Sequence, residues 1–370
     1  MQRLLPALLS VAAVGASSAA ETIHVPAEFA TVSAAVKAAN AGDTVVIAPG
    51  TYGPVLVDRA ITLVGVGSPL IVGGGSEEFE APLALRGPGT GRVRLVGLRV
   101  GGTIDASVYA VGTAAIQGDG FESLELFDCQ VDGPAWIAVG ELGPGLSAVA
   151  VAVPFVVLER TIARASASLA TGATAVPLPG APGVRVAGTL LLLDSIVRGG
   201  STGPFTHTDS GCGGQCPDSP GGDGVHANAL YLAASQVSGG LGATWHDFAN
   251  AVCCTCADGV AERVGERTQL GTELNGTGSA SLGGALVLSW NFPQPAAGLY
   301  QSFGLAPPTT MTNSFLDLAS ARLLFATTTG GNLSLLVPPT ATALLGLPFA
   351  FQLRFPSGAV SRPVGGVIFD

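Results

Sequence analysis

The stretch "ATVSAAVKAANAGDTVVIAPGTYG" (residues 30–53) joins the one convincing helix of the chain to its first strand. Within residues 31–40, apolar side chains recur at helical spacing and form a single stripe. They are Val32, Ala35, Val36 and Ala39. Asn40 and Gly42 then end the helix, and "TVVI" continues as a short apolar strand that stops at "PG". This order of elements predicts a helix that leads into a run of strands.

After the helix, the hydrophobic pattern changes to short apolar runs that each end in Gly or Pro. Examples are "AITLVGVG", "PLIVGGG" and "RVRLVGLRVGG". Runs of this length, bounded by turn residues, are typical of strands buried on at least one face. The sequence therefore predicts an all-β body behind the helix.

A weak repeat of the form L-x-x-[LCTS]-x-[VA]-x-[GA] recurs five times. The copies are Leu95–Gly102, Leu126–Gly133, Leu158–Ala165, Leu192–Gly199 and Leu232–Gly239. Each copy supplies inward apolar residues and then a small residue where the chain must turn. One such unit cannot bury its own hydrophobic face, but several units stacked in register can. The repeat predicts a solenoid.

The opening stretch, followed by "ITLVGVG", resembles the start of right-handed parallel β-helix proteins of the pectin-lyase-like superfamily. The resemblance implies that the helix (31–40) caps the open end of the solenoid and that "GDTV…PGTY" forms the first coil. We expect the β-helix to span residues 21–262, with a Cys-rich loop inserted at 199–224. An antiparallel β-sandwich is the alternative, but it would show neither a leading helix nor a repeat.

From about residue 263 to residue 370 the strand runs are richer in Phe and are separated by Pro and Gly. The pieces "GGNLSLLVPP", "LLGLPFAFQLRF" and "GGVIFD" resemble the small C-terminal β-domain of secreted β-helix proteins from Planctomycetes-like bacteria. Two sheets that pack their aromatic faces together are the simplest expectation. The expected C-terminal unit is therefore a small β-sandwich-like domain.

The chain is acidic, with a formal net charge of −10, and only 11% of its residues are charged. Since there is no basic run, nucleic acid is not an expected partner. Residues 1–20 read as a secretory signal peptide, because Arg3 precedes the apolar run "LLPALLSVAAVGA" and the small residues "SSAA". We expect a secreted, cell-surface or periplasmic protein without a membrane span after signal removal.

Six cysteines make disulfides the default in a secreted chain. The candidates are Cys129, Cys212, Cys216, Cys253, Cys254 and Cys256. Four thiolates around zinc, with His207 or His226 nearby, are an alternative that "CCTC" fits poorly. Cys129 lies in a strand-like run, where a buried free thiol is the second interpretation.

Candidate catalytic residues are few. A lyase base would have to be an arginine such as Arg185 or Arg198, because the only lysine, Lys37, lies in the helix. Asp223 and His226 in "GDGVHA" are the nearest approach to an acid–base pair, and Asp105 in "GGTIDASVYA" echoes a pectin methylesterase nucleophile without that family's other residues. Each of these residues also has an ordinary surface or turn interpretation.

The loop aspartates Asp209, Asp218 and Asp223 are candidates for a calcium site, although a solvated loop is the simpler interpretation. No cofactor is expected. The sequence therefore predicts a secreted β-helix protein that binds extracellular polysaccharide or has a structural or adhesive role, without an identifiable catalytic constellation. The alternative is a polysaccharide-active lyase or pectin-esterase-like enzyme on the same scaffold.

Overall fold

A computed structural model describes residues 20–73, 81–101, 103–105, 114–137, 145–168, 178–202, 205–206, 219–246, 252–278, 283–291, 297–302, 305–308, 314–316, 321–327, 331–336, 340, 348–355 and 360–368. Side chains are not described at 103–105, 135–137, 205–206, 245–246, 253, 276–278, 298, 325–327 and 366–367. The predicted signal peptide (1–20) lies almost wholly outside the described residues and stays a prediction. Within the described ranges, no helix is long and apolar enough to cross a membrane.

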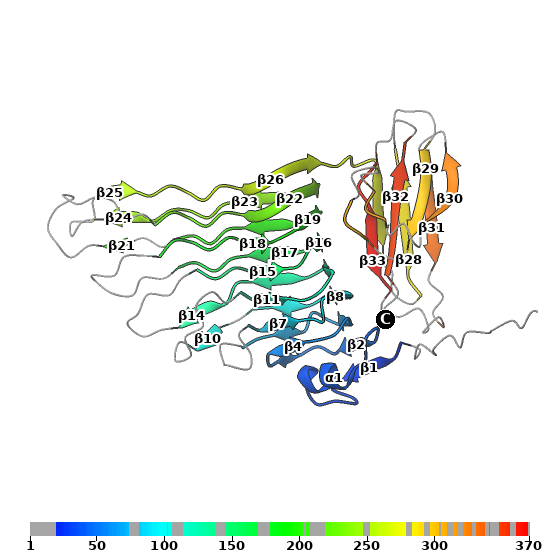
Figure 1. Cartoon of the computed structure of the whole chain (residues 1–370), viewed down its shortest axis with the longest axis horizontal. Helices are drawn as coiled ribbons and strands as arrows, with labels where there is room; N and C mark the ends of the chain where they lie inside the picture. The colour runs from blue at the N-terminus through cyan, green and yellow to red at the C-terminus, as the bar shows by residue number, and fades with distance from the viewer. Residues whose placement is uncertain are drawn as a thin grey trace, which may run out of the picture.

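The chain forms a parallel β-helix with an antiparallel β-domain packed along one side (Figure 1). Its large parallel sheet has two columns of strands joined at the last rungs. The first column contains β4 (Val55–Val57), β7 (Leu83–Arg86), β11 (Ile116–Asp119), β15 (Val149–Ala152) and β18 (Val184–Val186). The second column contains β1 (Thr22–Val25), β2 (Thr44–Ile47), β5 (Thr62–Gly65), β8 (Arg92–Val96), β12 (Ser123–Phe127), β16 (Phe155–Glu159) and β19 (Thr189–Leu193). The long strands β22 (Val225–Ala233) and β26 (Glu262–Gln269) run across both columns.

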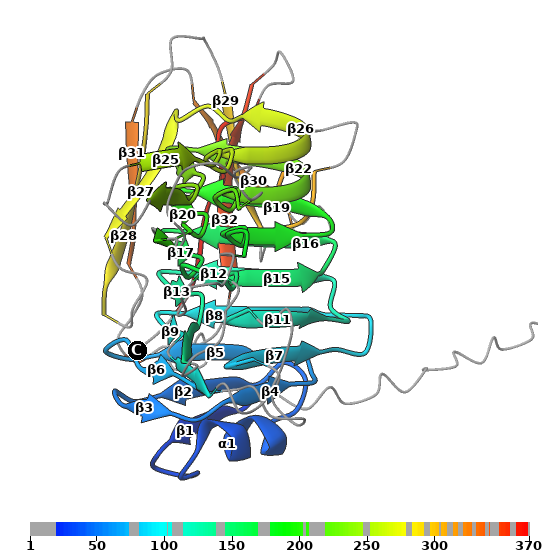
Figure 2. The same ribbon diagram turned by 90° about the vertical axis from the view of Figure 1, so that its left-hand side faces the viewer.

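A second parallel sheet closes the solenoid. It contains β3 (Thr51–Tyr52), β6 (Leu70–Ile71), β9 (Arg99–Val100), β13 (Gln130–Asp132), β17 (Ile162–Arg164), β20 (Ile196–Arg198) and β23 (Gln236–Ser238). The rungs stack in order of sequence from the helix upward (Figure 2). Apolar residues of all three columns point inward and form one continuous core.

The predicted repeat is confirmed as the register of the rungs. Leu95, Leu126, Leu158, Leu192 and Leu232 are Cα partners in consecutive strands. Val100, Val131, Ala163, Val197 and Val237 are partners in the second sheet. Parallel strands lie about 4.8 Å apart, so inward side chains at equal positions of neighbouring rungs pack against one another. The core is therefore built by identical positions of successive copies.

The capping helix is also confirmed, and it is slightly shorter than predicted. Helix α1 (Val32–Ala38) begins at Thr31, whose Oγ1 accepts a hydrogen bond from the Ala34 amide at 3.2 Å. Its buried face, Val32, Ala35 and Val36, joins the solenoid core at the N-terminal end. The helix thus covers apolar side chains that the first rung would otherwise expose to water.

One predicted boundary needs correction. The β-helix was expected to end at residue 262, with the following residues in the C-terminal unit. Instead, β26 pairs in parallel with β22 over Glu262–Gln269 and forms a further rung. The charged sequence of this strand conceals its rung character, because Glu262 and Arg267 replace the apolar residues expected at inward positions.

The C-terminal β-domain comprises two antiparallel sheets, as predicted. One contains β27 (Leu274–Gly278), β28 (Ala285–Trp290) and β31 (Gly331–Leu336). The other contains β29 (Ala297–Ser302), β30 (Arg322–Thr327), β32 (Pro348–Arg354) and β33 (Val364–Val367). Leu, Phe and Trp side chains from both sheets share a core that includes Leu288, Trp290, Leu299, Phe351 and Leu353.

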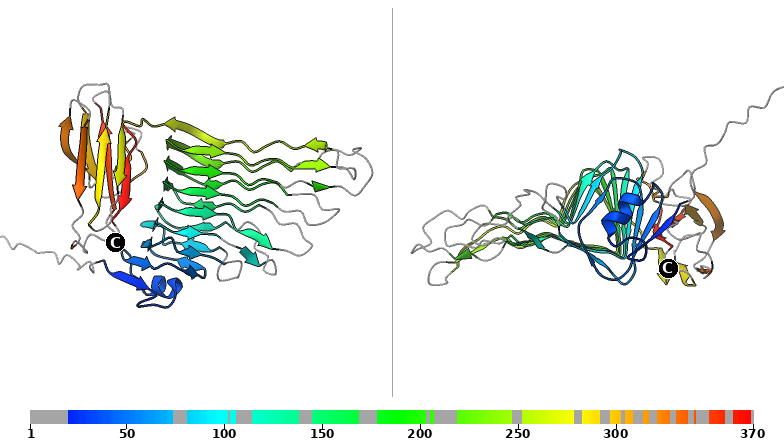
Figure 3. Two further views of the ribbon diagram at one scale, coloured as in Figure 1. Left: turned by 180° about the vertical axis from the view of Figure 1, so that it is seen from behind. Right: turned by 90° about the horizontal axis from the view of Figure 1, so that it is seen from below.

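A flat extension, here called the fin, projects from the solenoid on the side away from the C-terminal domain (Figures 1 and 3). Its strands are β10 (Thr103–Asp105), β14 (Ala135–Ile137), β21 (Phe205–Thr206), β24 (Thr244–His246) and β25 (Val252–Thr255). The sequence predicted one inserted loop, at 199–224. The structure shows that several rungs send out a segment after the second sheet and return it to the first column.

Glycines hold the base of the fin together. Backbone hydrogen bonds run from Gly200 N to Ala181 O (2.8 Å), Gly222 N to Gly200 O (2.8 Å), Gly240 N to Gly222 O (2.7 Å) and Gly259 N to Gly240 O (2.9 Å). These bonds join segments that leave the second sheet, at Gly200 and Gly240, to segments that return to the first column, at Ala181, Gly222 and Gly259. Two layers of backbone are therefore hydrogen-bonded to each other. Such close approach is possible because no side chain separates the layers.

Candidate functional site

The returning segment of the fin delivers Asp223 to the first column of the solenoid. There its carboxylate contacts one side chain of its own rung, in β22, and one of the next rung, in β26. Asp223 Oδ2 lies 2.5 Å from His226 Nε2 and 2.7 Å from Arg263 Nε, and Oδ1 accepts a hydrogen bond from the Val260 amide at 2.8 Å. The Asp223 side chain is only 10% exposed, whereas that of Arg263 is 70% exposed. The acid is thus a buried anchor for two outward basic groups.

Partial burial by itself would raise the pKa of Asp223. The hydrogen bonds from His226, Arg263 and the Val260 amide outweigh burial, and the pKa of this carboxyl lies below its ordinary value. Asp223 is therefore an ionised acceptor at neutral pH. Its bond to Nε2 of His226 fixes the orientation of the ring and leaves Nδ1 for a ligand.

Strand register extends this cluster along the solenoid. Arg185 in β18, His226 in β22 and Arg263 in β26 are Cα partners of one another in successive rungs. Partners in parallel strands point to the same face, and the flanking residues Val184 and Val186 are buried in the core. Arg185, His226 and Arg263 therefore form an outward basic ladder, a name used below for these three residues.

The structure brings together only some of the predicted site residues. Asp223 and His226 are in contact, and Arg185 is the neighbour of His226 in register. Arg198 lies in β20 on the other sheet, where its partner is Arg164. Asp105 belongs to β10 in the fin, opposite Ile137, and its side chain is outside the described set. The candidates therefore do not converge on one site.

Arg263 is the residue that the sequence analysis missed, because the β-helix was expected to end at residue 262. The signal that could have found it is the register, since "ERVGERTQ" occupies the rung after "VHANALYL" with the same alignment throughout. Because Glu262 and Arg267 stand at two of the inward positions, the repeat pattern does not reveal this rung.

The cysteine predictions have mixed outcomes. Cys129 was a disulfide candidate, but it is a free thiol buried in the solenoid core. Its Sγ approaches the carbonyl oxygens of Phe127 (3.2 Å) and Leu95 (3.4 Å), and burial raises its pKa to about 12. Since thiolate is the reactive form, this residue is chemically inert in the folded protein.

Cys253 and Cys254 lie in β25 of the fin. Cys254 in β25 is disulfide-bonded, and Cys256 follows the same strand. Cys212 and Cys216 fall outside the described residues, as does the side chain of Cys253. The pairing of these cysteines stays a prediction.

The predicted metal sites can be placed only in part. Asp209, Asp218 and His207 lie outside the described residues, so the calcium and zinc alternatives there stay untested. The carboxylate of Asp223 is engaged by three protein donors. Among the side chains that the structure describes, no group of three or more His, Cys, Asp or Glu residues is arranged to hold a metal ion.

No protein-family model matches the chain, and no curated protein matches it in sequence. The parallel β-helix architecture therefore rests on the strand order and the register of the rungs, without support from a relative.

Proposed function

We propose that this protein is a secreted binding protein that holds an anionic extracellular polysaccharide on the basic ladder. The observation that carries the proposal is the register of Arg185, His226 and Arg263 in three successive rungs. A guanidinium group can bind a sugar carboxylate through two parallel hydrogen bonds, and the ladder repeats basic groups at the spacing of the rungs. A uronate-containing chain lying along the first column fits this arrangement.

The local positive charge of the ladder supports binding of a polyanion, although the net charge of the chain is negative. An acidic protein as a whole repels polyanions, but ionic screening limits that repulsion to about 8 Å at physiological salt. The ladder presents two arginines and a histidine, and the aspartate that contacts His226 and Arg263 is largely buried. Binding would be weak, dependent on salt and confined to the first column.

The proposal includes a family and a location. The chain would be a divergent member of the pectin-lyase-like β-helix proteins, supported by the opening stretch and the parallel strand order. The signal-like residues 1–20 support secretion to the cell surface or periplasm. The C-terminal domain would resemble that of secreted proteins from Planctomycetes-like bacteria.

The test is binding of purified polyuronate and of neutral dextran to the full chain at low and physiological salt. We expect binding of polyuronate alone, and we expect Arg185→Gln to weaken it about tenfold, which is the usual cost of losing one charged hydrogen bond. Arg198→Gln is the matched control, because it removes an exposed arginine from the other sheet and should leave affinity unchanged. Equal losses in both variants, or no polyuronate binding, would refute the proposal.

A second candidate function is eliminative cleavage of the same polymer. The hydrogen bond between Asp223 and His226 favours it, because a carboxylate that orients a histidine is the usual support of a general base. Ultraviolet absorbance from unsaturated uronate ends would report this activity, and His226→Ala should abolish it. Binding without new absorbance would leave the non-catalytic proposal in place.

A further inference from the structure

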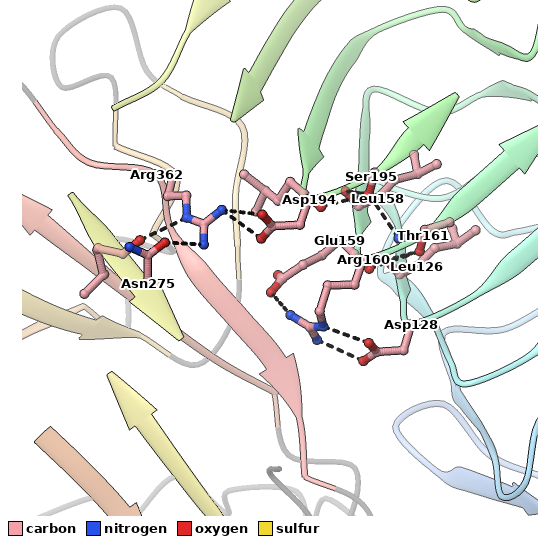
Figure 4. Close-up of polar contacts among 12 residues, drawn as sticks. Leu126, Asp128, Leu158, Glu159, Arg160, Thr161, Asp194, Ser195, Asn275 and Arg362 are labelled. Atoms are coloured by element: carbon pink, nitrogen blue, oxygen red, sulfur yellow. Dashed lines mark hydrogen bonds and ion pairs between the residues drawn. The ribbon is translucent and has the colours of Figure 1, made fainter. Parts of the chain in front are cut away.

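A second cluster of charged side chains lies where the C-terminal β-domain packs against the solenoid (Figure 4). The outward face of β16 and β19 contacts this domain through Phe155, Val157, Leu191 and Leu193, which pack with Leu305, Phe315 and Ala350. In this apolar surface stands Glu159, which is 2% exposed. Its neighbours in register are Phe127 and Leu193. A carboxyl group thus occupies a position at which the adjacent rungs place apolar side chains.

Only half of the Glu159 carboxyl is satisfied. Oε1 accepts a hydrogen bond from Arg160 Nη1, whereas Oε2 is buried and receives no hydrogen bond from any described group. Gly365 of β33 covers this oxygen, since a Cβ atom added to Gly365 would lie 3.4 Å from Oε2. The C-terminal domain therefore excludes water from an acid that it does not pair.

The other charged groups around Glu159 also have partners of their own. Arg160 also donates two hydrogen bonds to Asp128, at 2.7 and 2.9 Å. From the C-terminal domain, Arg362 contacts Asp194 with two bonds of 2.7 Å and also binds Leu274 O and Asn275 Oδ1. The ion pair of Asp194 and Arg362 crosses the interface and fastens the two parts together, while Glu159 beside it opposes that contact when ionised.

We infer that Glu159 makes docking of the C-terminal domain onto the solenoid dependent on pH, tight with a protonated carboxyl and weaker with an ionised one. On docking, the carboxyl of Glu159 moves from water into an apolar interface. The ionised form therefore carries a desolvation cost that the protonated form avoids. Undocking returns Glu159 to solvent and removes this cost.

The direction of the pKa agrees with this inference. The pKa of Glu159 is raised to about 7, mainly by burial. Arg160 acts to lower it, whereas the charges of Asp128 and Asp194 act in the same direction as burial. In the undocked state the carboxyl would return toward its ordinary value near 4.5. The stabilising contribution is therefore fully present below that ordinary value and is lost as the pH rises through about 7.

The test measures docking in the full chain by oxidative footprinting in a urea series at pH values from about 5.5 to 8.5. Leu191 and Phe315 report exposure of the interface, and Leu124 in the solenoid core reports global unfolding; all three are fully buried in the folded chain. We expect the docking equilibrium constant to fall about tenfold or more across this range, since one unit of pKa shift corresponds to a factor of ten. A constant docking equilibrium across the range would overturn the inference.

Three variants distinguish the pH-dependent effect of Glu159 from the contribution of the ion pair between Asp194 and Arg362. Glu159→Gln keeps the shape and the acceptor for Arg160, so docking should become independent of pH. Glu159→Leu, which matches Leu193 in the next rung, should give the same flat profile with tighter docking at the alkaline end. Asp194→Asn removes the fastening ion pair and should weaken docking at every pH with the wild-type slope. A wild-type slope in either Glu159 variant would overturn the inference.

Discussion

At the scale of single residues, the turn residues between the helix and the first coil (residues 40–53) can be explained by backbone conformation and hydrogen bonding. Gly42 adopts a φ of +96°, which lets the chain turn sharply after the helix. The buried carboxylate of Asp43 accepts hydrogen bonds from the amides of Glu21 (2.8 Å) and Asn40 (2.6 Å), and so ties the first strand to the end of the helix. Tyr52 Oη donates to Ala48 O at 2.9 Å and closes the "PGTY" corner.

Gly222 provides a residue-scale prediction about the fin. A Cβ atom at this position would lie 2.0 Å from Ala181 O, which is backbone and cannot move aside. We expect Gly222→Ala to destabilise the base of the fin by about 3 kcal/mol, the upper range for overpacking. Amide exchange of residues 219–224 would increase. Gly53→Ala is the control, since nothing lies within 4 Å of its added Cβ and its φ lies outside the left-handed region; equal effects would contradict the prediction.

At the scale of elements, the rung is built around a left-handed corner. The third residue of the repeat has positive φ in every copy: Gly97, Asp128, Arg160, Asp194 and Ala234. The next position holds hydroxyl groups in three copies, and the Thr161 and Ser195 amides donate to the hydroxyls of Ser195 and Ser235 in the following rungs, both at 3.1 Å. Small polar residues at this corner satisfy backbone donors that the turn removes from the sheet.

The last rung, β26, closes the solenoid at the end opposite α1. Glu262 and Arg267 are in register with the buried residues Val225 and Leu230, and they form an ion pair of 2.6 Å. Among the described strands, β26 pairs with β22 alone. Inward charges on an edge strand prevent another chain from adding to it, because stacking would bury them.

If the inward charges of β26 prevent edge-to-edge pairing, their removal should cause the protein to self-associate. Replacing both charges, as Glu262→Leu with Arg267→Leu, should make the end of the core apolar and cause dimers or larger species to form. Sedimentation velocity would detect them at micromolar concentration. Glu266→Leu is the matched control, because Glu266 is in register with the outward position of Ala229. Monomeric double variants would show that these charges do not protect the edge.

At the scale of the whole molecule, the C-terminal domain covers a face that the solenoid cannot leave in water. Phe155, Val157, Leu191 and Leu193 all point outward from their rungs and are buried only through this contact. Tyr231 and Phe315 meet edge to face across it, with ring centroids 5.0 Å apart. The two parts are therefore one assembly under conditions that keep Glu159 protonated.

Phe315 tests this contact directly. We expect Phe315→Ala to weaken docking by about 3 kcal/mol, as large-to-small changes in a core do, and to increase binding of a hydrophobic dye. Fluorescence titration of the dye would report the exposed face. Leu336→Ala is the control, since Leu336 belongs to the same domain but is 77% exposed. Similar dye binding by both variants would refute the role of Phe315 in docking.

The sequence by itself determined the cap helix, the parallel solenoid, the register of five rungs and the β-sandwich character of the C-terminal domain. These features depend on local periodicity and on repeated positions, which are visible along the chain. Only the tertiary structure decided that Arg263 joins Asp223 and His226, that Cys129 is buried as a free thiol and that Glu159 lies beneath Gly365. Those contacts join residues from different rungs or domains, and stacking, rather than nearness in sequence, sets which side chains meet.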